Sequence, residues 1–296
     1  MGRRIATVGM FDGVHCGHRY LVEQMRSEAV CRGLETEVVT FATHPLLTIR
    51  PECVPPMLSL PSERVALLAS IGVDYCRVLD FDADMQRLTA REFMAMLHEQ
   101  DGVDVMILGF NNRFGSDRLC DIADYQRIGA EVGVEVLQAK EYPGVSSSVV
   151  RQQLAEHDVQ GAAESLGRYY SISGTVVKGK QLGRTIGFPT ANVAVGDKSK
   201  LVPPIGVYAC VADVGDGERY PAMVNIGRCP TVDANNNAVT IEANIIGFDS
   251  DIYGCEIEIE FVDYLRGEQR FGSLDELVAQ LEFDRQRALD ITASAL

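Results

Sequence analysis

Residues 183–192 read GRTIGFPTAN and combine groups that could bind a metal-bound nucleotide. Two glycines in this run leave the backbone open to close approach, and Arg184 carries a planar cation. Pro189 restricts the turn that presents Thr190 and Asn192. A hydroxyl and an amide oxygen two residues apart are neutral hard ligands, and together with nucleotide phosphates they suit Mg²⁺. The run lacks the Gly-Lys-Ser/Thr ending of a Walker loop, and the alternative is a polar turn between strands.

A second polar run, residues 9–18, reads GMFDGVHCGH and directly follows the apolar run 5–8. A buried strand that leads through glycines into a helix places free N–H groups and the positive end of the helix dipole where a phosphate can bind. His15 and His18 are three residues apart, so both imidazoles face one side of the first helical turn and can donate to phosphate oxygens. The alternative is that the two histidines only cap and pack the helix start.

The composition limits the classes of partner. A chain of 296 residues suits two domains of about 150 residues each, and 46% hydrophobic residues provide ordinary cores. The net charge of −15 repels nucleic acid and acidic lipid, so neither is expected as a partner. The eight cysteines form no CxxC pair, and no apolar run approaches the roughly 18 residues of a membrane span. We therefore expect reduced thiols, a cytoplasmic location and no membrane contact; the oligomeric state stays open.

Periodicity divides the chain into halves of different type. Up to about residue 160, short apolar runs alternate with helical patterns, which predicts a parallel sheet covered on both faces. The expected strands are 5–9, 35–41, 75–80, 103–108 and 134–137, and the expected helices are 17–32, 62–71, 89–100, 121–132 and 147–156. Thr89 with Glu92 forms a capping box for the third of these helices.

Beyond about residue 167, period-two runs predict a small antiparallel barrel. The expected strands are 171–177, 206–214, 220–227, 239–246 and 256–264. Ser273 with Glu276 then opens a final helix that extends to about residue 289.

Three further polar segments of the first half follow predicted strands: 40–45, 109–115 and 145–151. The carboxyl ends of strands in an open α/β sheet are where ligands bind, so these segments fit a nucleotide-transfer site.

Both polar runs resemble the signatures of known enzymes. GRTIGFPTAN resembles the signature of riboflavin kinases, and GMFDGVHCGH is similar to the GxFDGVHxGH motif of prokaryotic FAD synthetases. The resemblance covers nearly the whole chain in order, and the sequence is identified as a member of the bifunctional riboflavin kinase/FAD synthetase family. This implies a Rossmann-like nucleotidylyltransferase domain over 1–160 and a β-barrel riboflavin kinase domain with a terminal helix over 167–296. ATP and Mg²⁺ would serve both steps, with riboflavin and FMN as substrates.

The resemblance also implies roles for individual residues. In the first half the FMN phosphate would attack the α-phosphorus of ATP, with His15, His18 and Arg151 as catalytic donors. ATP and phosphate contacts are expected at Gly9, Phe11, Asp12, Gly13, Gly17, Ser147, Ser148, Gly179, Gly183, Arg184 and Pro189, the metal at Thr190 and Asn192, and flavin contacts at Asn111, Arg113, Phe114, Asn225 and Arg266.

Phosphorylation of riboflavin needs a base, because its 5′-hydroxyl is a poor nucleophile until it loses its proton. Glu242 is the expected base, since it is a carboxylate between apolar Ile241 and Ala243 and the family places its base here. The alternative is an outward glutamate on a half-exposed strand.

The chain departs from the family pattern at several positions. Ala42 and Thr43 stand where many members have an acidic residue and proline, and Asn111 with Asn112 replaces an Asp-Phe pair. Asn244 stands where histidine is common. These departures bear on flavin fit and on the surroundings of Glu242.

Two other readings stay open at this point. One half could have lost its activity, leaving a kinase or an adenylyltransferase alone. A non-catalytic flavin or nucleotide carrier is the second, but a carrier would need neither Glu242 nor the paired histidines.

Overall fold

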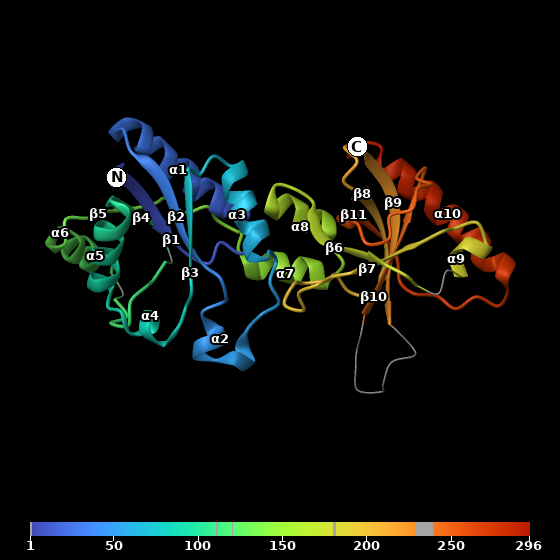
Figure 1. The fold of residues 1–296 in the computed structure, drawn as a ribbon, viewed down its shortest axis with the longest axis horizontal. Helices are drawn as coiled ribbons and strands as arrows, with labels where there is room; N and C mark the ends of the chain where they lie inside the picture. Colours follow the sequence, from blue (N-terminus) through green and yellow to red (C-terminus); the bar gives the residue numbers. More distant parts are fainter. Residues whose placement is uncertain (1, 111, 120, 180–181, 229–238) are drawn as a thin grey trace. The chain divides into compact units, whose positions relative to one another are not determined.

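The computed structural model describes residues 2–110, 112–119, 121–179, 182–228 and 239–296. The chain forms two compact units, Met1–Ser147 and Ser148–Leu296 (Figure 1). Both predicted architectures are confirmed, since the first unit holds a parallel sheet and the second a closed barrel. The predicted domain limits, 1–160 and 167–296, stay a prediction.

The first unit is built on a five-stranded parallel sheet with strand order β3-β2-β1-β4-β5. The strands are β1 (Arg4–Val8), β2 (Glu35–Phe41), β3 (Tyr75–Leu79), β4 (Val103–Leu108) and β5 (Glu135–Gln138). All five predicted runs agree with these bounds to within one residue at each end. The apolar runs are continuous because both faces of a central parallel strand are covered by helices.

Helices cover the two faces of this sheet and provide two separate cores. The helices are α1 (Cys16–Arg32), α2 (Leu46–Ile49), a 3₁₀ turn at Pro51–Cys53, α3 (Pro61–Ser70), α4 (Ala83–Arg87), α5 (Ala90–Asp101) and α6 (Ile122–Glu131). One core joins α5 and α6 to alternate strand residues such as Ala6 and Met106. The other joins α1 and α3 to the intervening residues such as Ile5 and Val105.

Local signals start and stop these helices as the sequence predicts. The Thr89 hydroxyl accepts the Glu92 N–H, and the Glu92 carboxylate accepts the Thr89 N–H, which confirms the capping box on α5. Helix α1 ends at Gly33, which has the left-handed φ of 65° that glycine adopts without strain.

The second unit contains a closed barrel with strand order β10-β7-β6-β11-β8-β9. The strands are β6 (Tyr170–Val177), β7 (Ala191–Ala194), β8 (Gly206–Asp213), β9 (Arg219–Arg228), β10 (Val239–Ile245) and β11 (Glu256–Arg266). The period-two runs predicted five of these strands. The prediction missed β7, whose four residues are too few to show periodicity, although β7 pairs with both β6 and β10 and closes the barrel.

Helices α7 (Ser147–Ala155) and α8 (Val159–Leu166) precede the barrel strands in the sequence. Helix α9 (Leu182–Thr185) lies between β6 and β7, and α10 (Leu274–Thr292) follows the last strand. Helix α10 begins where predicted, because the Ser273 hydroxyl accepts the Glu276 N–H. Its buried Ala288 belongs to a core with Val207, Met223 and Leu265 of the strands. Helix α10 therefore lies on the outer face of β8, β9 and β11.

We predict that a fragment of residues 148–296 folds cooperatively on its own and is more stable than a fragment of residues 165–296. The shorter fragment lacks most of α8, which packs on β6 and β11 with Val159 and Ala162 fully buried. Losing this burial should lower the free energy of unfolding by roughly 3 kcal/mol. Urea unfolding followed by circular dichroism measures both fragments. Equal stability would show that α8 is not part of the folding unit, in agreement with a C-terminal domain that begins at residue 167.

Candidate active sites

The loop between β1 and α1 has an unusual backbone. Phe11 and Val14 have φ of 49° and 42°, and Gly13 between them has 78°. Left-handed backbone is rare for bulky and β-branched residues, and each such residue costs on the order of 1–3 kcal/mol unless the surroundings impose it. Strain of this kind collects at functional sites, and it falls here on the predicted phosphate-binding run.

The buried Asp12 holds this loop in place. Its carboxylate accepts the N–H groups of Leu58 (3.1 Å) and Ser59 (2.9 Å) and the Ser59 hydroxyl (3.2 Å). The Ser59 hydroxyl oxygen in turn accepts the Gly13 N–H at 2.9 Å. From the other side, the Ser147 hydroxyl donates to the Asp12 carbonyl at 2.9 Å. In this structure the Asp12 side chain contacts the 58–59 segment, so its expected ATP contact stays a prediction.

The two histidines lie together at the start of α1. His15 caps the helix, since its Nδ1 accepts the His18 N–H at 3.4 Å, which puts its own proton on Nε2. The two rings stack with centroids 3.7 Å apart, and the Phe11 ring lies 4.7 Å from the His18 ring. Burial, then nearby His15 and Arg64, hold the pKa of His18 well below its usual range.

His18 is therefore neutral at neutral pH, with its Nδ1 buried. Among the described residues Nδ1 has no hydrogen-bond partner. A buried ring nitrogen without a partner marks a place where a ligand can complete the hydrogen bonding.

A pocket of about 320 Å³ opens beside these rings. It brings together the 9–18 run, the 109–112 segment after β4 and the 139–145 segment after β5, as expected for the carboxyl ends of neighbouring strands. Its lining includes Gly9, Phe11, His15, Gly17, His18, Phe110, Asn112, Lys140, Tyr142 and Val145.

The predicted flavin contacts of this half are Asn111, Arg113 and Phe114, which all follow β4 in the sequence. Asn111 lies outside the described residues, while the Asn112 amide donates to the Val8 carbonyl and ties the loop to β1. The Arg113 guanidinium donates to the Asn112 carbonyl at 2.9 Å. Phe114 packs between Phe93 and Tyr125 with ring centroids 5.2 and 4.8 Å away. Phe114 therefore contributes to the core, and its predicted flavin contact is untested.

Ser148 and Arg151 belong to the second unit, on α7. Ser148 is exposed and Arg151 is half-buried. Their predicted part in the first reaction stays a prediction.

In the barrel, three predicted residues form a row across adjacent strands. Glu242 on β10 lies directly opposite Asn192 on β7 and opposite Asn225 on β9. Directly opposed side chains have Cβ atoms about 5 Å apart and share one face. All three are half-buried. Gly179 makes room for the row, since a Cβ there would collide with the Asn192 amide.

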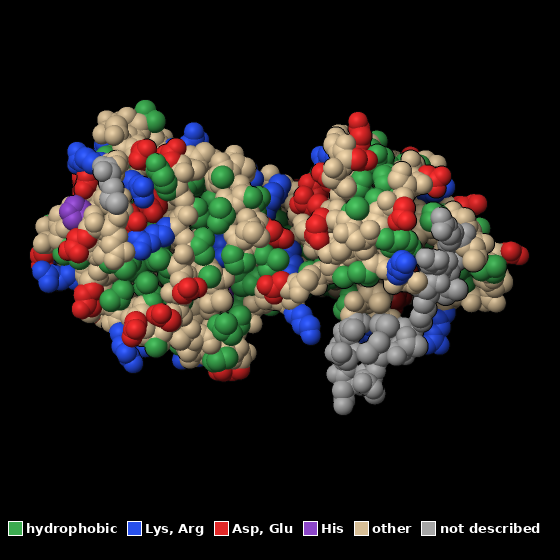
Figure 2. All heavy atoms as spheres, in the orientation of Figure 1, with side chains coloured by type: hydrophobic (Ala, Val, Ile, Leu, Met, Phe, Trp, Pro, Cys, Tyr) green, Lys and Arg blue, Asp and Glu red, His purple; other side chains and the backbone are tan. Residues whose placement is uncertain are grey.

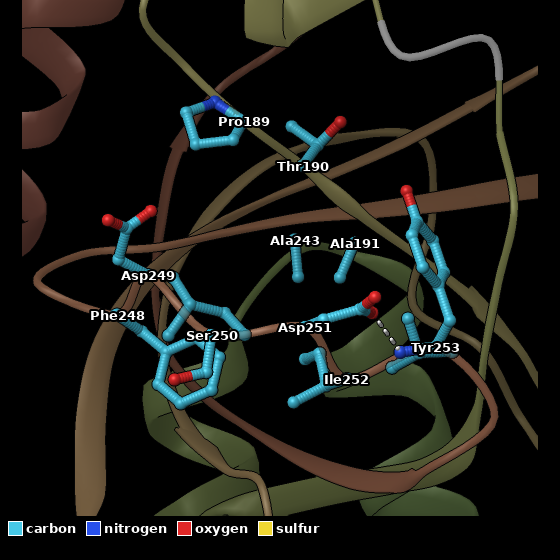
Figure 3. A pocket seen from close by; sticks show the side chains of 12 residues that line it. Pro189, Thr190, Ala191, Ala243, Phe248, Asp249, Ser250, Asp251, Ile252 and Tyr253 are labelled. Atoms are coloured by element: carbon cyan, nitrogen blue, oxygen red, sulfur yellow. Dashed lines mark hydrogen bonds between the residues drawn. The ribbon is translucent and has the colours of Figure 1, made fainter.

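A pocket of about 270 Å³ lies on the other face of the same strands. Ala191 and Ala243, which are cross-strand partners, point into it side by side (Figure 3). Because side chains alternate along a strand, Asn192 and Glu242 point away from this pocket. Its lining also includes Val176, Pro189, Thr190, Ile245, Phe248, Asp249, Ser250, Asp251, Ile252 and Tyr253.

Asn244 connects the two faces. Its side chain is 8% exposed, and its amide donates to the Pro189 carbonyl at 2.7 Å. Thr190 follows Pro189, so this bond fixes the Thr190 segment to the strand that carries Glu242. The departure from histidine thus keeps a hydrogen-bond donor at this position.

Arg266 is held by an acid that the sequence did not single out. The Asp284 carboxylate on α10 accepts Arg266 Nε at 2.8 Å, and its side chain is 1% exposed. Gln280 donates to the other carboxylate oxygen at 2.8 Å. An aspartate within an amphipathic helix gives no signal in a single sequence, so only the fold shows this pair. The side chain of Arg184 lies outside the described residues.

The chain matches two family models, one in each half. Residues 2–152 match the model described as FAD synthetase, and residues 166–292 match the model described as riboflavin kinase.

Curated relatives match over nearly the full length. Bifunctional riboflavin kinase/FMN adenylyltransferases are 37% identical over 290 residues in Escherichia coli strain K12, covering 96% of this chain and 91% of the relative. The match to the Pseudomonas fluorescens protein is 37% over 294 residues, with 98% and 93% covered. The match to the Bacillus subtilis strain 168 protein is 32% over 294 residues, with 97% and 92% covered.

A solved structure described as a macrolide-efflux protein from Streptococcus pneumoniae shares the fold. Its TM-score is 0.87 at 30% identity, with 97% of this chain and 94% of the other covered. Within the ranges that the structure describes, no helix is both long and apolar enough to span a membrane. Acidic side chains are spread over the visible face of both units, in keeping with the net charge of −15 (Figure 2).

We predict that acid destabilises the chain through His18. In the unfolded state this ring binds a proton below its ordinary pKa of 6.5, whereas the folded state keeps it neutral to a lower pH. The contribution of neutral His18 to the free energy of unfolding is therefore intact above the ordinary pKa of 6.5. It falls as the pH drops below that value, by up to about 1.4 kcal/mol per pH unit. His18→Gln removes the titration, so its melting temperature should fall less than that of the wild type between about pH 7.5 and about pH 5.5. Parallel pH dependence of the two proteins would contradict the lowered pKa.

Proposed function

This chain belongs to the family of bifunctional riboflavin kinase/FMN adenylyltransferases, and on that premise we propose which of its residues carry each reaction. The protein phosphorylates riboflavin to FMN with ATP in its C-terminal half and adenylylates FMN to FAD in its N-terminal half.

We assign adenylyl transfer to the 320 Å³ pocket at the start of α1. An oxygen of the FMN phosphate attacks the α-phosphorus of ATP, a new P–O bond forms, and the bond to the bridging oxygen breaks to release pyrophosphate. An ionised phosphate needs no general base, so catalysis depends on positioning and on neutralising charge. The stacked His15 and His18 support this assignment, since two imidazoles at a helix N-terminus can donate to phosphate oxygens, and the lowered pKa of His18 keeps that ring neutral.

We assign riboflavin phosphorylation to the row formed by Asn192, Glu242 and Asn225. Glu242 accepts the proton of the ribityl hydroxyl, whose oxygen attacks the γ-phosphorus of ATP, and ADP leaves. The single observation that supports this most is that Glu242 directly opposes Asn192, because base and predicted metal ligand then share one face. Arg266, fixed by Asp284, and Asn225 are the proposed flavin contacts.

The 270 Å³ pocket suits the nucleotide of the kinase reaction. Its walls combine apolar Ala191 and Ala243 with polar Thr190, and a purine base needs such mixed surroundings. Thr190 lines this pocket, whereas Asn192 lies on the face of Glu242, so their neutral oxygens would hold Mg²⁺ bound to nucleotide phosphates at the end of β7, between the two faces. The metal would supply charge neutralisation at the transferred phosphoryl group. A cytoplasmic location stays a prediction from the scattered cysteines.

We predict that Glu242→Gln lowers FMN formation by roughly 10²-fold or more, because the amide keeps the shape and hydrogen bonding but accepts no proton. Riboflavin and ATP affinities should change little. Steady-state formation of FMN, measured by chromatography under conditions where chemistry limits the rate, gives kcat and KM separately.

Glu258→Gln is the matched control, since Glu258 is an exposed carboxylate on β11 of the same barrel. FAD formation from supplied FMN should be unchanged in both variants. A wild-type rate in Glu242→Gln would exclude Glu242 as the base and direct attention to Asp249, one of the two aspartates that line the 270 Å³ pocket.

For the N-terminal half, we predict that His18→Ala lowers FAD formation by roughly 10²–10³-fold and leaves FMN formation intact.

We predict that Asn244→Ala lowers FMN formation by roughly tenfold, since it removes the hydrogen bond that fixes Pro189 next to Thr190 and leaves that carbonyl without the donor. Half-saturation by Mg²⁺ should rise, whereas the KM for riboflavin should stay within about twofold. Titration of FMN formation with Mg²⁺ measures both effects. Asn244→His, which retains a donor, should recover part of the loss; unchanged Mg²⁺ dependence in Asn244→Ala would contradict the role.

A further inference from the structure

Arg64 on α3 is the largest polar side chain that is completely buried among the described residues. It is 0% exposed, and burial lowers the pKa of its guanidinium, an effect that the nearby Asp12 carboxylate opposes. Moving a cation out of water costs several kcal/mol after relaxation, so a buried arginine without a specific task is rare. A leucine would fill this position of α3 at no such cost, as Leu68 does one turn later.

The guanidinium donates to the ends of two neighbouring strands. One terminal nitrogen donates to the Met10 carbonyl at 2.8 Å, and the other donates to the Phe41 carbonyl at 2.7 Å. Met10 follows β1 and Phe41 ends β2. Among the described residues, the buried Nε has no partner. A planar group with two parallel donors can bridge these carbonyls, whereas a lysine ammonium presents a single point charge.

The Met10 carbonyl belongs to the peptide that enters the strained loop. Phe11, with its φ of 49°, follows directly, and the Thr40 hydroxyl donates to the same carbonyl at 3.0 Å. Two donors thus fix the orientation of the Met10–Phe11 peptide. The Phe11 ring then contacts His18, so the orientation of this peptide is transmitted to the phosphate-binding histidine.

We propose that Arg64 is a positioning residue for adenylyl transfer: through its two carbonyl hydrogen bonds it fixes the Met10–Phe11 peptide and thereby the Phe11 and His18 rings that line the pocket. The inference rests on the proposed assignment of this reaction to the His15/His18 pocket. Arg64 does not touch the reacting atoms, and its effect is on geometry and on the field at His18.

The charge of Arg64 has a separate consequence at His18. It is one of the groups that keep this ring neutral, after burial and His15. The other ionisable groups among the described residues that line this pocket are Lys140, Glu141 and Tyr142. Loss of the Arg64 cation should therefore raise the titration midpoint of His18, while a lysine in its place should keep the midpoint low.

The test compares Arg64→Lys and Arg64→Met with Leu68→Ala in the full-length protein. Leu68→Ala weakens the same helix without removing a hydrogen bond from the loop, so it controls for stability alone. For each variant we would measure the melting temperature, kcat for FAD formation from supplied FMN, kcat for FMN formation, and the titration of the His18 ring by NMR. All rates are taken well below the melting temperature.

We expect both Arg64 variants to lose at least tenfold in kcat for FAD formation and to keep FMN formation within twofold of the wild type. Arg64→Met should also raise the His18 titration midpoint, whereas Arg64→Lys should not. Leu68→Ala should lower the melting temperature and keep kcat. If Arg64→Met does not fold, Arg64→Lys alone carries the test, since it retains the charge and most of the volume.

Three results would overturn the inference. A folded Arg64→Lys with wild-type kcat for FAD formation would show that the two-carbonyl bridge is dispensable. An equal loss in Leu68→Ala would show that any weakening of α3 suffices, and an equal loss of FMN formation would show a general defect. The proposed site itself is tested separately by His18→Ala: if that variant forms FAD normally, the pocket assignment fails whatever Arg64 does.

Discussion

The hydrogen bonds to the buried Asp12 carboxylate hold the N-terminal active-site loop in a conformation that its own residues disfavour. Two non-glycine residues with positive φ cost on the order of 2–6 kcal/mol together, and the three donors from the 58–59 segment offset that cost. This constraint sets where α1 can begin, and hence where His15 and His18 meet. The proposed adenylylation site therefore depends on the 58–59 segment, which binds the Asp12 side chain.

In the barrel, strand pairing brings the proposed site residues together. Asn192, Glu242 and Asn225 are far apart in sequence, and they become neighbours only because β10 pairs with both β7 and β9. The register is strict, since a slip by one residue would turn Glu242 toward the pocket and Ala243 away from it. The pairing of β10 with β7 and β9 thus decides on which face the proposed base and its neighbours lie.

Periodicity and capping signals predicted most of the fold, because they are local. The parallel sheet, five barrel strands and the caps at Thr89 and Ser273 could be read from short windows of sequence. What the sequence could not show was pairing over long distances: Asp12 with Ser59, and Arg266 with Asp284. Nothing in the sequence singled out Arg64, since a single sequence does not reveal which face of α3 meets the loop.

The two faces of the β7–β10 ribbon have a kinetic consequence. On the proposed assignment, the nucleotide occupies the face of Ala191 and Ala243, and the flavin approaches the face of Glu242. The ribbon ends at Ala191, and Thr190 lies where the two faces meet. The two substrates would then approach from different faces, so that ADP could depart while FMN is still bound and a second ATP could enter without waiting. Neither substrate need bind first.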